Sequence, residues 1–236
     1  GEIIPVDSEQ SAIFQCLCAG EKREVRRLIL TASGGPFRQF TKEQLDKVTP
    51  QMACHHPTWN MGRKITIDSA SLFNKGLEIM EAAYLFGMDA EKISVLVHPQ
   101  SVVHSMVEYC DSAVIAQLSA PDMRLAIHYA LTYPKRHESS FGALDLTKLG
   151  MLTFEEPDTE RFRAIPLAYR ALEAGGIMPA VYNGANEDMF IKGMIRFTDI
   201  ADHVERAMDS IANAAVGSFE GLLEYDAMAR MAAVKG

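Results

Sequence analysis

The sequence has few of the features that mark membrane, secreted or nucleic-acid-binding proteins. In its 236 residues, no apolar run reaches the roughly 20 residues needed to cross a bilayer. The first residues, Gly-Glu-Ile-Ile-Pro, lack the basic region and apolar core of a signal peptide. A formal charge of −8 argues against nucleic acid as the main partner, although a local basic pocket could still hold an anionic small ligand. We therefore expect no nucleic-acid partner and no membrane partner.

Cysteine is also scarce and is scattered along the chain. The four residues are Cys16, Cys18, Cys54 and Cys110. Only the first two are close together and no second pair follows, so the spacing fits no zinc framework. We interpret them as reduced thiols in a cytoplasm-like compartment, with a Cys16–Cys18 redox pair as the alternative.

Hydrophobic periodicity changes along the chain, from strand-like and helical segments to helical segments alone. The chain is long enough for one large core or two modest domains. Strands are predicted at residues 3–6, 25–32, 64–67, 93–97 and 113–118. Helices are predicted at residues 11–17, 41–48, 76–85, 123–132, 167–174, 178–190, 199–208 and 214–233.

This pattern predicts an α+β fold. Its first part is an open, mostly β-sheet catalytic domain covered by helices on one face, and a small C-terminal helical bundle follows. The expected boundaries are a catalytic and dimerisation domain at 1–134, a connector at 135–160 and a helical domain at 161–236.

Two carboxylates stand close to the beginning of the chain. Asp7 and Glu9 are two residues apart, so in extended backbone they point the same way at the end of a strand. Their repulsion would be relieved by a proton, a lysine or a divalent cation such as Mg²⁺ or Mn²⁺. The alternative is helix capping, with Asp7 or Ser8 as N-cap of the next helix.

Residues 56–78 carry the densest set of polar side chains. A turn with the only tryptophan, Trp59, leads to hydroxyls, an amide and an ammonium at an expected helix start: Asp68, Ser69, Ser71, Asn74 and Lys75. Such groups suit a phosphate monoester, because a helix N-terminus offers N–H groups and partial positive charge. Glu78 shares a helix face with Lys75, which suggests a metal beside the phosphate. The alternative is a cap at Asp68 or Ser69, with Lys75 and Glu78 as a solvated ion pair.

Three further features are less specific. Ser33 precedes Gly34 and Gly35 at the end of a predicted strand, which is typical of a turn and also lets backbone approach a phosphate closely. His104 alternates with apolar neighbours, which favours a structural histidine. Asn183, Asn186 and Glu187 are expected on one side of a helix.

A series of motifs gains specificity from its order along the chain. These motifs lie at residues 5–9, 33–37, 56–64, 68–70, 74–78, 98–101, 121–124 and 195–200. Together they closely resemble the 1-deoxy-D-xylulose 5-phosphate reductoisomerase family, in its catalytic and C-terminal portions.

The resemblance implies both an activity and its partners. The family isomerises a phosphorylated ketose and reduces the product with NADPH to 2-C-methyl-D-erythritol 4-phosphate, an isoprenoid precursor. The implied cofactors are a divalent metal (Mg²⁺, Mn²⁺ or Co²⁺) and NADPH. Implied partners are the small phosphorylated ketose, phosphonohydroxamate inhibitors and a second copy in a homodimer. The expected compartment is the cytoplasm in a bacterium or the plastid in a eukaryote.

The resemblance also implies a role for each matched residue. Asp7, Glu9 and Glu78 match metal ligands with a catalytic role, and Ser8 matches a substrate contact beside them. Trp59 and Met61 match a flap over the substrate, and Gly62 matches a position near the nicotinamide. His104 matches a histidine near the site, which we expect to have a catalytic role. The phosphate site is matched by Ser33, His56, Ser69, Asn74 and Lys75.

The chain also departs from the family pattern. No Gly-x-Gly-x-x-Gly motif of a dinucleotide-binding domain occurs in these residues, and a family lysine upstream of Asp7 has no counterpart. We therefore expect the chain as given to be a truncated form that cannot transfer hydride efficiently. The alternatives are a non-catalytic phosphosugar- and metal-binding module, or a structural dimerising fragment. Gly184 stands where the family more often has alanine, and glycine there should loosen a helix by about 1 kcal/mol.

Overall fold

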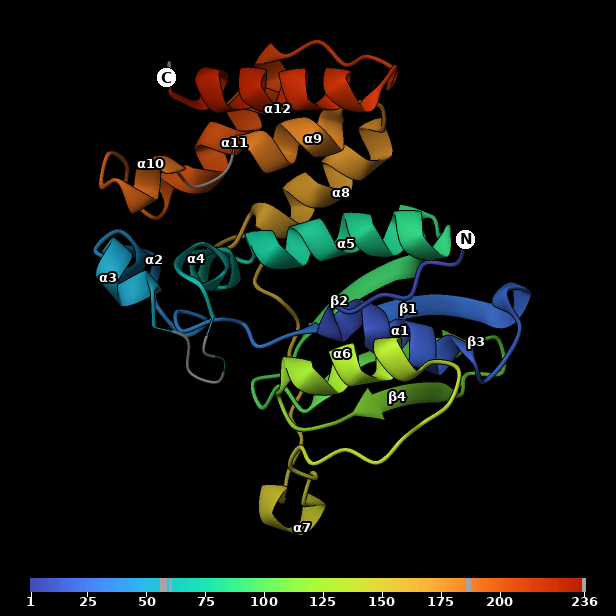
Figure 1. Cartoon of the computed structure of the whole chain (residues 1–236). Coiled ribbons are helices and arrows are strands. Elements are labelled where there is room, and N and C mark those ends of the chain that lie inside the picture. Colours follow the sequence, from blue (N-terminus) through green and yellow to red (C-terminus); the bar gives the residue numbers. More distant parts are fainter. Residues whose placement is uncertain (56–58, 60, 186–187, 235–236) are drawn as a thin grey trace. The chain divides into compact units, whose positions relative to one another are not determined.

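The computed structural model describes residues 1–55, 59, 61–185 and 188–234 (Figure 1). The chain forms two compact units, each built from two stretches of sequence. Gly1–Ser33 and Glu81–Pro157 form the first unit, and Gly34–Met80 and Asp158–Gly236 form the second. Helix α5 (Phe73–Phe86) begins in the second unit and ends in the first. Within the described residues, no helix combines the length and the apolar character needed to span a membrane.

The first unit is built on a four-stranded mixed sheet with the order β2-β1-β3-β4. The central strand β1 pairs in parallel with β2 and antiparallel with β3, which pairs antiparallel with β4. The strands are β1 (Val25–Ala32), β2 (Ile93–Val97), β3 (Val103–Tyr109) and β4 (Val114–Leu118). The predicted strands at 25–32, 93–97 and 113–118 are therefore confirmed, the last to within one residue.

Helices cover one face of this sheet, as predicted. Helix α1 (Ser8–Leu17) contacts β3 and β4, and it lies beside α6 (Met123–Thr132) (Figure 1). Ala12, Ile13 and Cys16 of α1 are buried, while β1 buries Leu28 and Leu30 in the centre of the sheet. Asp122 caps α6 by accepting a hydrogen bond from the Arg124 backbone N–H. Short elements complete the unit: η1 (Lys22–Glu24), η2 (Ala90–Lys92) and α7 (Leu146–Leu149).

The second unit contains the predicted C-terminal bundle. Helices α8, α9, α11 and α12 pack against one another (orange to red in Figure 1), around fully or nearly fully buried Val181, Tyr182, Ile200 and Val204. The helices are α2 (Lys42–Leu45), α3 (Pro50–Ala53), α4 (Arg63–Ser71), α8 (Ala164–Ala174), α9 (Met178–Gly184), α10 (Asp188–Ile191), α11 (Asp199–Ser210) and α12 (Phe219–Val234). The predicted helix 178–190 is thus divided between α9 and α10.

Two predicted strands are wrong. Residues 3–6 form no strand, and Ile3 is 75% exposed. The run is short, and Pro5 has no N–H to donate to a sheet. Residues 64–67 belong to helix α4. Their β-branched side chains suggested a strand, but the helix buries Ile67 and Ala70, three residues apart, on one face.

The division into 1–134, 135–160 and 161–236 stays a prediction about functional domains. The compact units follow the chain differently, because 34–80 pack with the C-terminal helices. The expected connector contributes to the first unit, where Glu155 forms an isolated β-bridge with Val97 of β2.

Candidate functional site

The start of α1 presents the predicted carboxylates at a helix N-terminus. Asp7 occupies the N-cap position in extended conformation, and its side chain makes no capping hydrogen bond to the helix. Glu9 lies in the first helical turn, so the expected strand-end placement of both carboxylates is wrong. The Ser8 hydroxyl donates to Glu9 Oε2 at 2.6 Å. All three residues are half-buried, and the positive end of the helix dipole stabilises the negative charges of Asp7 and Glu9.

A β-bulge carries His104. The pairing of β3 with β4 shifts between Val103 and Ser105, so an extra residue enters β3 at His104. Bulges of this kind turn a side chain away from its regular direction and are common beside active sites. His104 is 6% exposed and lines a cavity of about 260 Å³ together with Ser8. The first unit therefore brings together two of the predicted site residues.

Thr31 supports this bulge from the neighbouring strand. Its hydroxyl, which is buried, lies 2.7 Å from the backbone carbonyl oxygen of Val103 and 2.8 Å from that of His104, and it donates to them. Sequence reasoning did not find Thr31, because a lone threonine in an apolar strand gives no signal of a partner more than 70 residues away.

The glycine turn after Ser33 packs directly against α4. Gly34 and Gly35 have φ values of 80° and 67°, a region that favours glycine. A Cβ atom on Gly35 would lie 2.9 Å from the backbone oxygen of Ser69 and 2.9 Å from the Cα of Ala70. Both glycines are therefore needed for the chain that leaves Ser33 to approach Ser69, another predicted phosphate-site residue.

The first turns of α5 hold a buried polar cluster. Asn74 Nδ2 and Lys75 Nζ both donate to the carboxylate of Glu78. Lys75 and Glu78 are each only 3% exposed, so the alternative of a solvated ion pair is wrong. Removing both charges from water is costly, and the close pairing offsets part of that cost.

The predicted helix start is correct for Asn74 and Lys75, but it is wrong for Asp68 and Ser69. These two lie within α4, and Asp68 is buried and accepts from Lys64 Nζ at 2.7 Å. Leu72, in the left-handed conformation with φ of 63°, ends α4 just before α5 begins. Ser69 is therefore a residue of the last turn of α4, and it acts from there if it binds phosphate.

Trp59, Met61 and Gly62 lie between α3 and the first turn of α4. Trp59 and Met61 are half-buried. Gly62 is exposed and is the N-cap of α4, with φ of −60°, so its conformation does not require glycine. His56 lies outside the described residues, as do Asn186 and Glu187. Asn183 is exposed and donates through Nδ2 to Asp226 Oδ1 at 3.1 Å, which is a structural role.

Tyr182 fixes the back of α5. A Cβ atom on Gly76 would lie 2.0 Å from Tyr182 Oη, so glycine is required for α5 to approach α9. The Tyr182 hydroxyl donates to the Ala164 carbonyl at 3.1 Å. Burial, with a smaller contribution from the charge of Asp68, raises the pKa of Tyr182 well above its usual value. This hydroxyl therefore stays protonated and links α9 to α8, and its closeness to Gly76 sets how near α5 can pack.

Comparison with known proteins gives consistent matches along nearly the whole chain. One family model, 1-deoxy-D-xylulose 5-phosphate reductoisomerase C-terminal domain, matches residues 3–86. A second, DXP reductoisomerase C-terminal domain, matches residues 118–232. The chain is 55% identical over 227 residues to 1-deoxy-D-xylulose 5-phosphate reductoisomerase of Clostridium botulinum (strain Okra / Type B1), covering 95% of this chain and 59% of the relative. It is 54% identical over 236 residues to that of Pelotomaculum thermopropionicum, covering 99% and 61%.

Solved structures give the same result. The enzyme from Zymomonas mobilis in complex with NADPH has a TM-score of 0.92 and 47% identity, covering 98% of this chain and 60% of that one. A DOX-P reductoisomerase in complex with NADPH, fosmidomycin and magnesium has a TM-score of 0.91 and 38% identity, covering 99% and 63%. The chain spans 59% to 63% of the length of these relatives.

Proposed function

Because this chain belongs to the 1-deoxy-D-xylulose 5-phosphate reductoisomerase family, we propose that it forms the metal- and phosphate-binding part of such an enzyme. The reaction would convert 1-deoxy-D-xylulose 5-phosphate to 2-C-methyl-D-erythritol 4-phosphate with NADPH, in isoprenoid biosynthesis. The observation that carries the proposal is the buried cluster in which Asn74 and Lys75 both donate to Glu78.

We propose that Asp7, Glu9 and Glu78 hold the divalent metal. All three side chains are carboxylates, and their oxygens are the ligands that a hard divalent ion prefers. Within the first unit, Glu81 of α5 accepts from Gln10 Nε2 at 3.4 Å, and Gln10 adjoins Glu9. Carboxylate oxygens suit Mg²⁺, Mn²⁺ or Co²⁺, and solved relatives contain magnesium.

The phosphate of the substrate would bind at the start of α5. Lys75 supplies a full positive charge and Asn74 a neutral donor, while the N–H groups of the first turn add partial charge. Ser33 and Ser69 would add hydroxyl donors, and His56 belongs to the same proposed set. When metal and phosphate bind, Glu78 would turn its oxygens to the metal and Lys75 would turn its ammonium to the phosphate.

The remaining proposed roles follow from position. The metal, when bound, would act as a Lewis acid on adjacent substrate oxygens. Ser8 and His104 line one cavity, so a substrate oxygen held beside Ser8 would be near the imidazole. Trp59 and Met61 would cover the substrate and exclude water. Gly62, which carries no side chain, would leave room for the nicotinamide.

The test is a thermal-stability titration of this chain with Mn²⁺ and fosmidomycin, with Glu78→Gln as the control variant. At 100 times its dissociation constant, a ligand should add about 2.7 kcal/mol to the free energy of unfolding. We expect stabilisation that needs both metal and inhibitor and is lost in Glu78→Gln. Equal stabilisation of the variant would reject the proposed ligand set, and no shift in the wild-type chain would leave the alternative of a structural fragment.

Turnover separates a catalytic chain from a binding module. We expect the 236 residues alone to bind metal and inhibitor without appreciable NADPH oxidation, because they contain no Gly-x-Gly-x-x-Gly motif. NADPH oxidation at a rate typical of enzymes, on the order of 1 to 10³ s⁻¹, would show that hydride transfer does not need such a motif.

We also propose that the chain forms a homodimer through its sheet. Strand β4 is an edge strand on which Val114 and Ile115 are 48% and 38% exposed, and an exposed apolar edge strand favours pairing with another chain. Light scattering at micromolar concentration should give twice the chain mass, and a monomeric mass would reject this assembly.

A further inference from the structure

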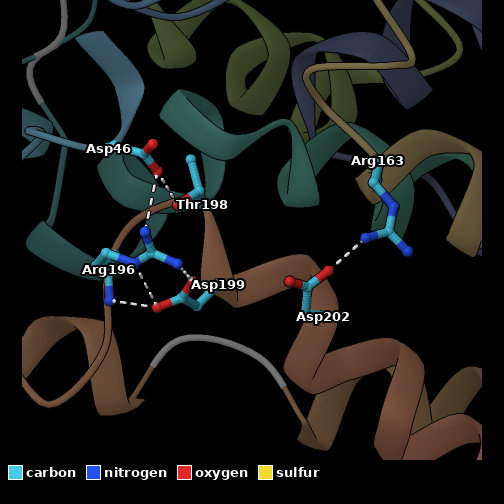
Figure 2. Close-up of polar contacts among 6 residues, drawn as sticks. All are labelled: Asp46, Arg163, Arg196, Thr198, Asp199 and Asp202. Carbon is cyan, nitrogen blue, oxygen red and sulfur yellow. Dashed lines mark hydrogen bonds and ion pairs between the residues drawn. The ribbon is translucent and has the colours of Figure 1, made fainter. Parts of the chain in front are cut away.

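The short helices that precede Trp59 are fastened to the C-terminal bundle of the second unit. Residues 41–54, here called the α2–α3 segment, end five residues before Trp59. Asp46 lies just after α2, and its Oδ1 accepts from Thr198 Oγ1 at 2.7 Å and from Arg196 Nη1 at 3.5 Å (Figure 2). The two donors lie 150 or more residues further along the chain. This contact fixes the α2–α3 segment to the start of α11.

Arg196 is held in place before it reaches Asp46. Its Nη2 donates to Asp199 Oδ1 at 2.6 Å and its Nε to Oδ2 at 3.1 Å, in a two-pronged pairing that Figure 2 shows. Its backbone N–H also donates to Asp199 Oδ2, at 3.0 Å. A planar guanidinium fixed at two nitrogens loses little further freedom when a third is used. The donor to Asp46 is therefore preorganised.

The residue between the two donors anchors them to the core. Phe197 is buried and packs edge-on against Phe37 and Phe190, with ring centroids 5.4 Å and 5.6 Å apart. Such aromatic pairs add about 0.5–1.5 kcal/mol beyond the burial of their area. The polar contacts to Asp46 thus lie at the rim of a packed aromatic cluster, which fixes where Arg196 and Thr198 emerge.

The same unit also contacts the chain on both sides of the α2–α3 segment and Trp59. Before them, Arg161 donates to the backbone carbonyls of Phe40 and, at 3.2 Å, of Arg38. After them, Arg63 Nη2 donates to the Ile191 carbonyl at 3.4 Å. Described residues before and after Trp59 and Met61 are therefore held by Arg161 and by the Ile191 carbonyl of the same unit.

We propose that Arg196, Thr198 and Asp199 form a clamp that positions Trp59 and Met61 for ligand binding. Arg196 is a positioning residue, because it acts through Asp46 and the α2–α3 segment and does not itself touch the ligand. The effect on ligand affinity rests on the proposed function, in which Trp59 and Met61 cover the substrate. The effect on the position of Trp59 does not rest on the proposed function.

Trp59 supplies a direct readout, because it is the only tryptophan of the chain. We would measure acrylamide quenching of its fluorescence in the ligand-free chain, and fosmidomycin affinity with Mn²⁺, for wild type and Arg196→Ala. The variant should show more quenching. If the fraction of molecules with Trp59 in place falls to about one tenth, the apparent dissociation constant rises about tenfold, which corresponds to about 1.4 kcal/mol.

Arg170→Ala is the matched control. Arg170 joins α8 to the far end of α11 through Asp209, with a half-exposed side chain like that of Arg196. Its ion pairs within the described part of the chain go to Glu205 and Asp209 of α11. The quenching of Trp59 and the fosmidomycin affinity of Arg170→Ala should equal those of wild type. Thr198→Val, which keeps the shape and removes the 2.7 Å hydrogen bond, should reproduce the Arg196→Ala effect in part and decides the question if Arg196→Ala does not fold.

The outcomes separate the clamp from the proposed function. Wild-type quenching and affinity in both Arg196→Ala and Thr198→Val would overturn the clamp. If the wild-type chain binds no inhibitor, the proposed function fails, and quenching alone still decides whether the clamp positions Trp59. Equal increases in Arg170→Ala and Arg196→Ala would mean a general loosening of the bundle and would also overturn the clamp.

Discussion

At Gly184, packing determines the residue and helix propensity does not. A Cβ atom there would lie 2.5 Å from the backbone oxygen of Asp226 and 2.9 Å from its Oδ1. Alanine would therefore push α9 away from α12, although alanine is the better helix former. The glycine that departs from the family pattern is thus matched by a close approach of two helices.

We predict that Gly184→Ala lowers the free energy of unfolding by about 1–3 kcal/mol, the usual cost of overpacking. Propensity alone predicts a gain of about 1 kcal/mol. Urea denaturation of wild type and variant measures the change in the free energy of unfolding and gives its sign. Gly221→Ala is the control, since its Cβ would meet only Ser218 Oγ at 3.4 Å, an ordinary contact. A more stable Gly184→Ala variant would show that α12 moves aside easily.

Cys16 should be chemically inert where Cys18 and Cys110 react. Burial raises the pKa of the Cys16 thiol to about 11, and the side chain is only 2% exposed. Iodoacetamide attacks the thiolate, so at pH 8 mass spectrometry should find the exposed Cys18 and Cys110 modified and Cys16 intact. Modified Cys16 in the folded chain at that pH would contradict the placement of α1 on the sheet.

The raised pKa of the Cys16 thiol also makes the free energy of unfolding depend on pH. The unfolded thiol loses its proton near its ordinary pKa of 9.0, whereas burial keeps the folded thiol protonated up to a pKa of about 11. The unfolded state therefore binds fewer protons in this window, and the contribution of Cys16 to the free energy of unfolding falls as pH rises. Below pH 9 both states are protonated and this contribution is complete. Cys16→Ser should flatten that part of the pH profile.

Among the elements, those with local start and stop signals were predictable. The strand 25–32 is followed by Ser33 and two glycines, and α6 starts after Asp122 and ends before Pro134. The α4 helix was not predictable in this way. Its β-branched residues favour a strand locally, and the helix is decided by the burial of Ile67 against residues that the local pattern does not reveal.

The residues of the candidate site also divide into those that the local sequence predicts and those that it does not. Asn74, Lys75 and Glu78 could be placed on one helix from their spacing alone, and the structure confirms that placement. Thr31 and Tyr182 could not be found. Each acts through a contact to a distant part of the chain, Thr31 on the His104 bulge and Tyr182 through Gly76, and such contacts leave no periodic signal.

The start of α1 allows helix capping to be separated from metal binding. Asp7 has the N-cap position without a capping hydrogen bond, whereas Thr41 caps α2 by accepting from the Gln44 N–H at 3.4 Å. Without metal, Thr41→Ala should cost about 1 kcal/mol of unfolding free energy. Asp7→Asn loses no capping hydrogen bond, but it removes a negative charge from the helix N-terminus and should cost about 0.3–1 kcal/mol.

With Mn²⁺ and fosmidomycin present, Asp7→Asn should become more destabilising than Thr41→Ala. Asp7→Asn should lose the ligand-dependent stabilisation, and Thr41→Ala should keep the wild-type increment. Thermal denaturation with and without the two ligands measures both. An Asp7→Asn variant that loses stability without metal but keeps the ligand-dependent shift would assign Asp7 to the helix and not to the ion.

At the scale of the whole molecule, the proposed ligands come from both compact units. Asp7 and Glu9 belong to the first unit, and Glu78 belongs to the second. Helix α5 is shared between them and carries Glu78 before the boundary and Glu81 after it.

We predict that calorimetry of the ligand-free chain gives a van't Hoff enthalpy below the calorimetric enthalpy, because two compact units can unfold separately. Mn²⁺ and fosmidomycin should raise the transition temperature of wild type, since ligands at about 100 times the dissociation constant add roughly 2.7 kcal/mol to the folded state. This shift should be absent in Glu78→Gln at every ligand concentration. Equal enthalpies in the ligand-free chain would show that α5, which the two units share, makes the chain unfold as one body.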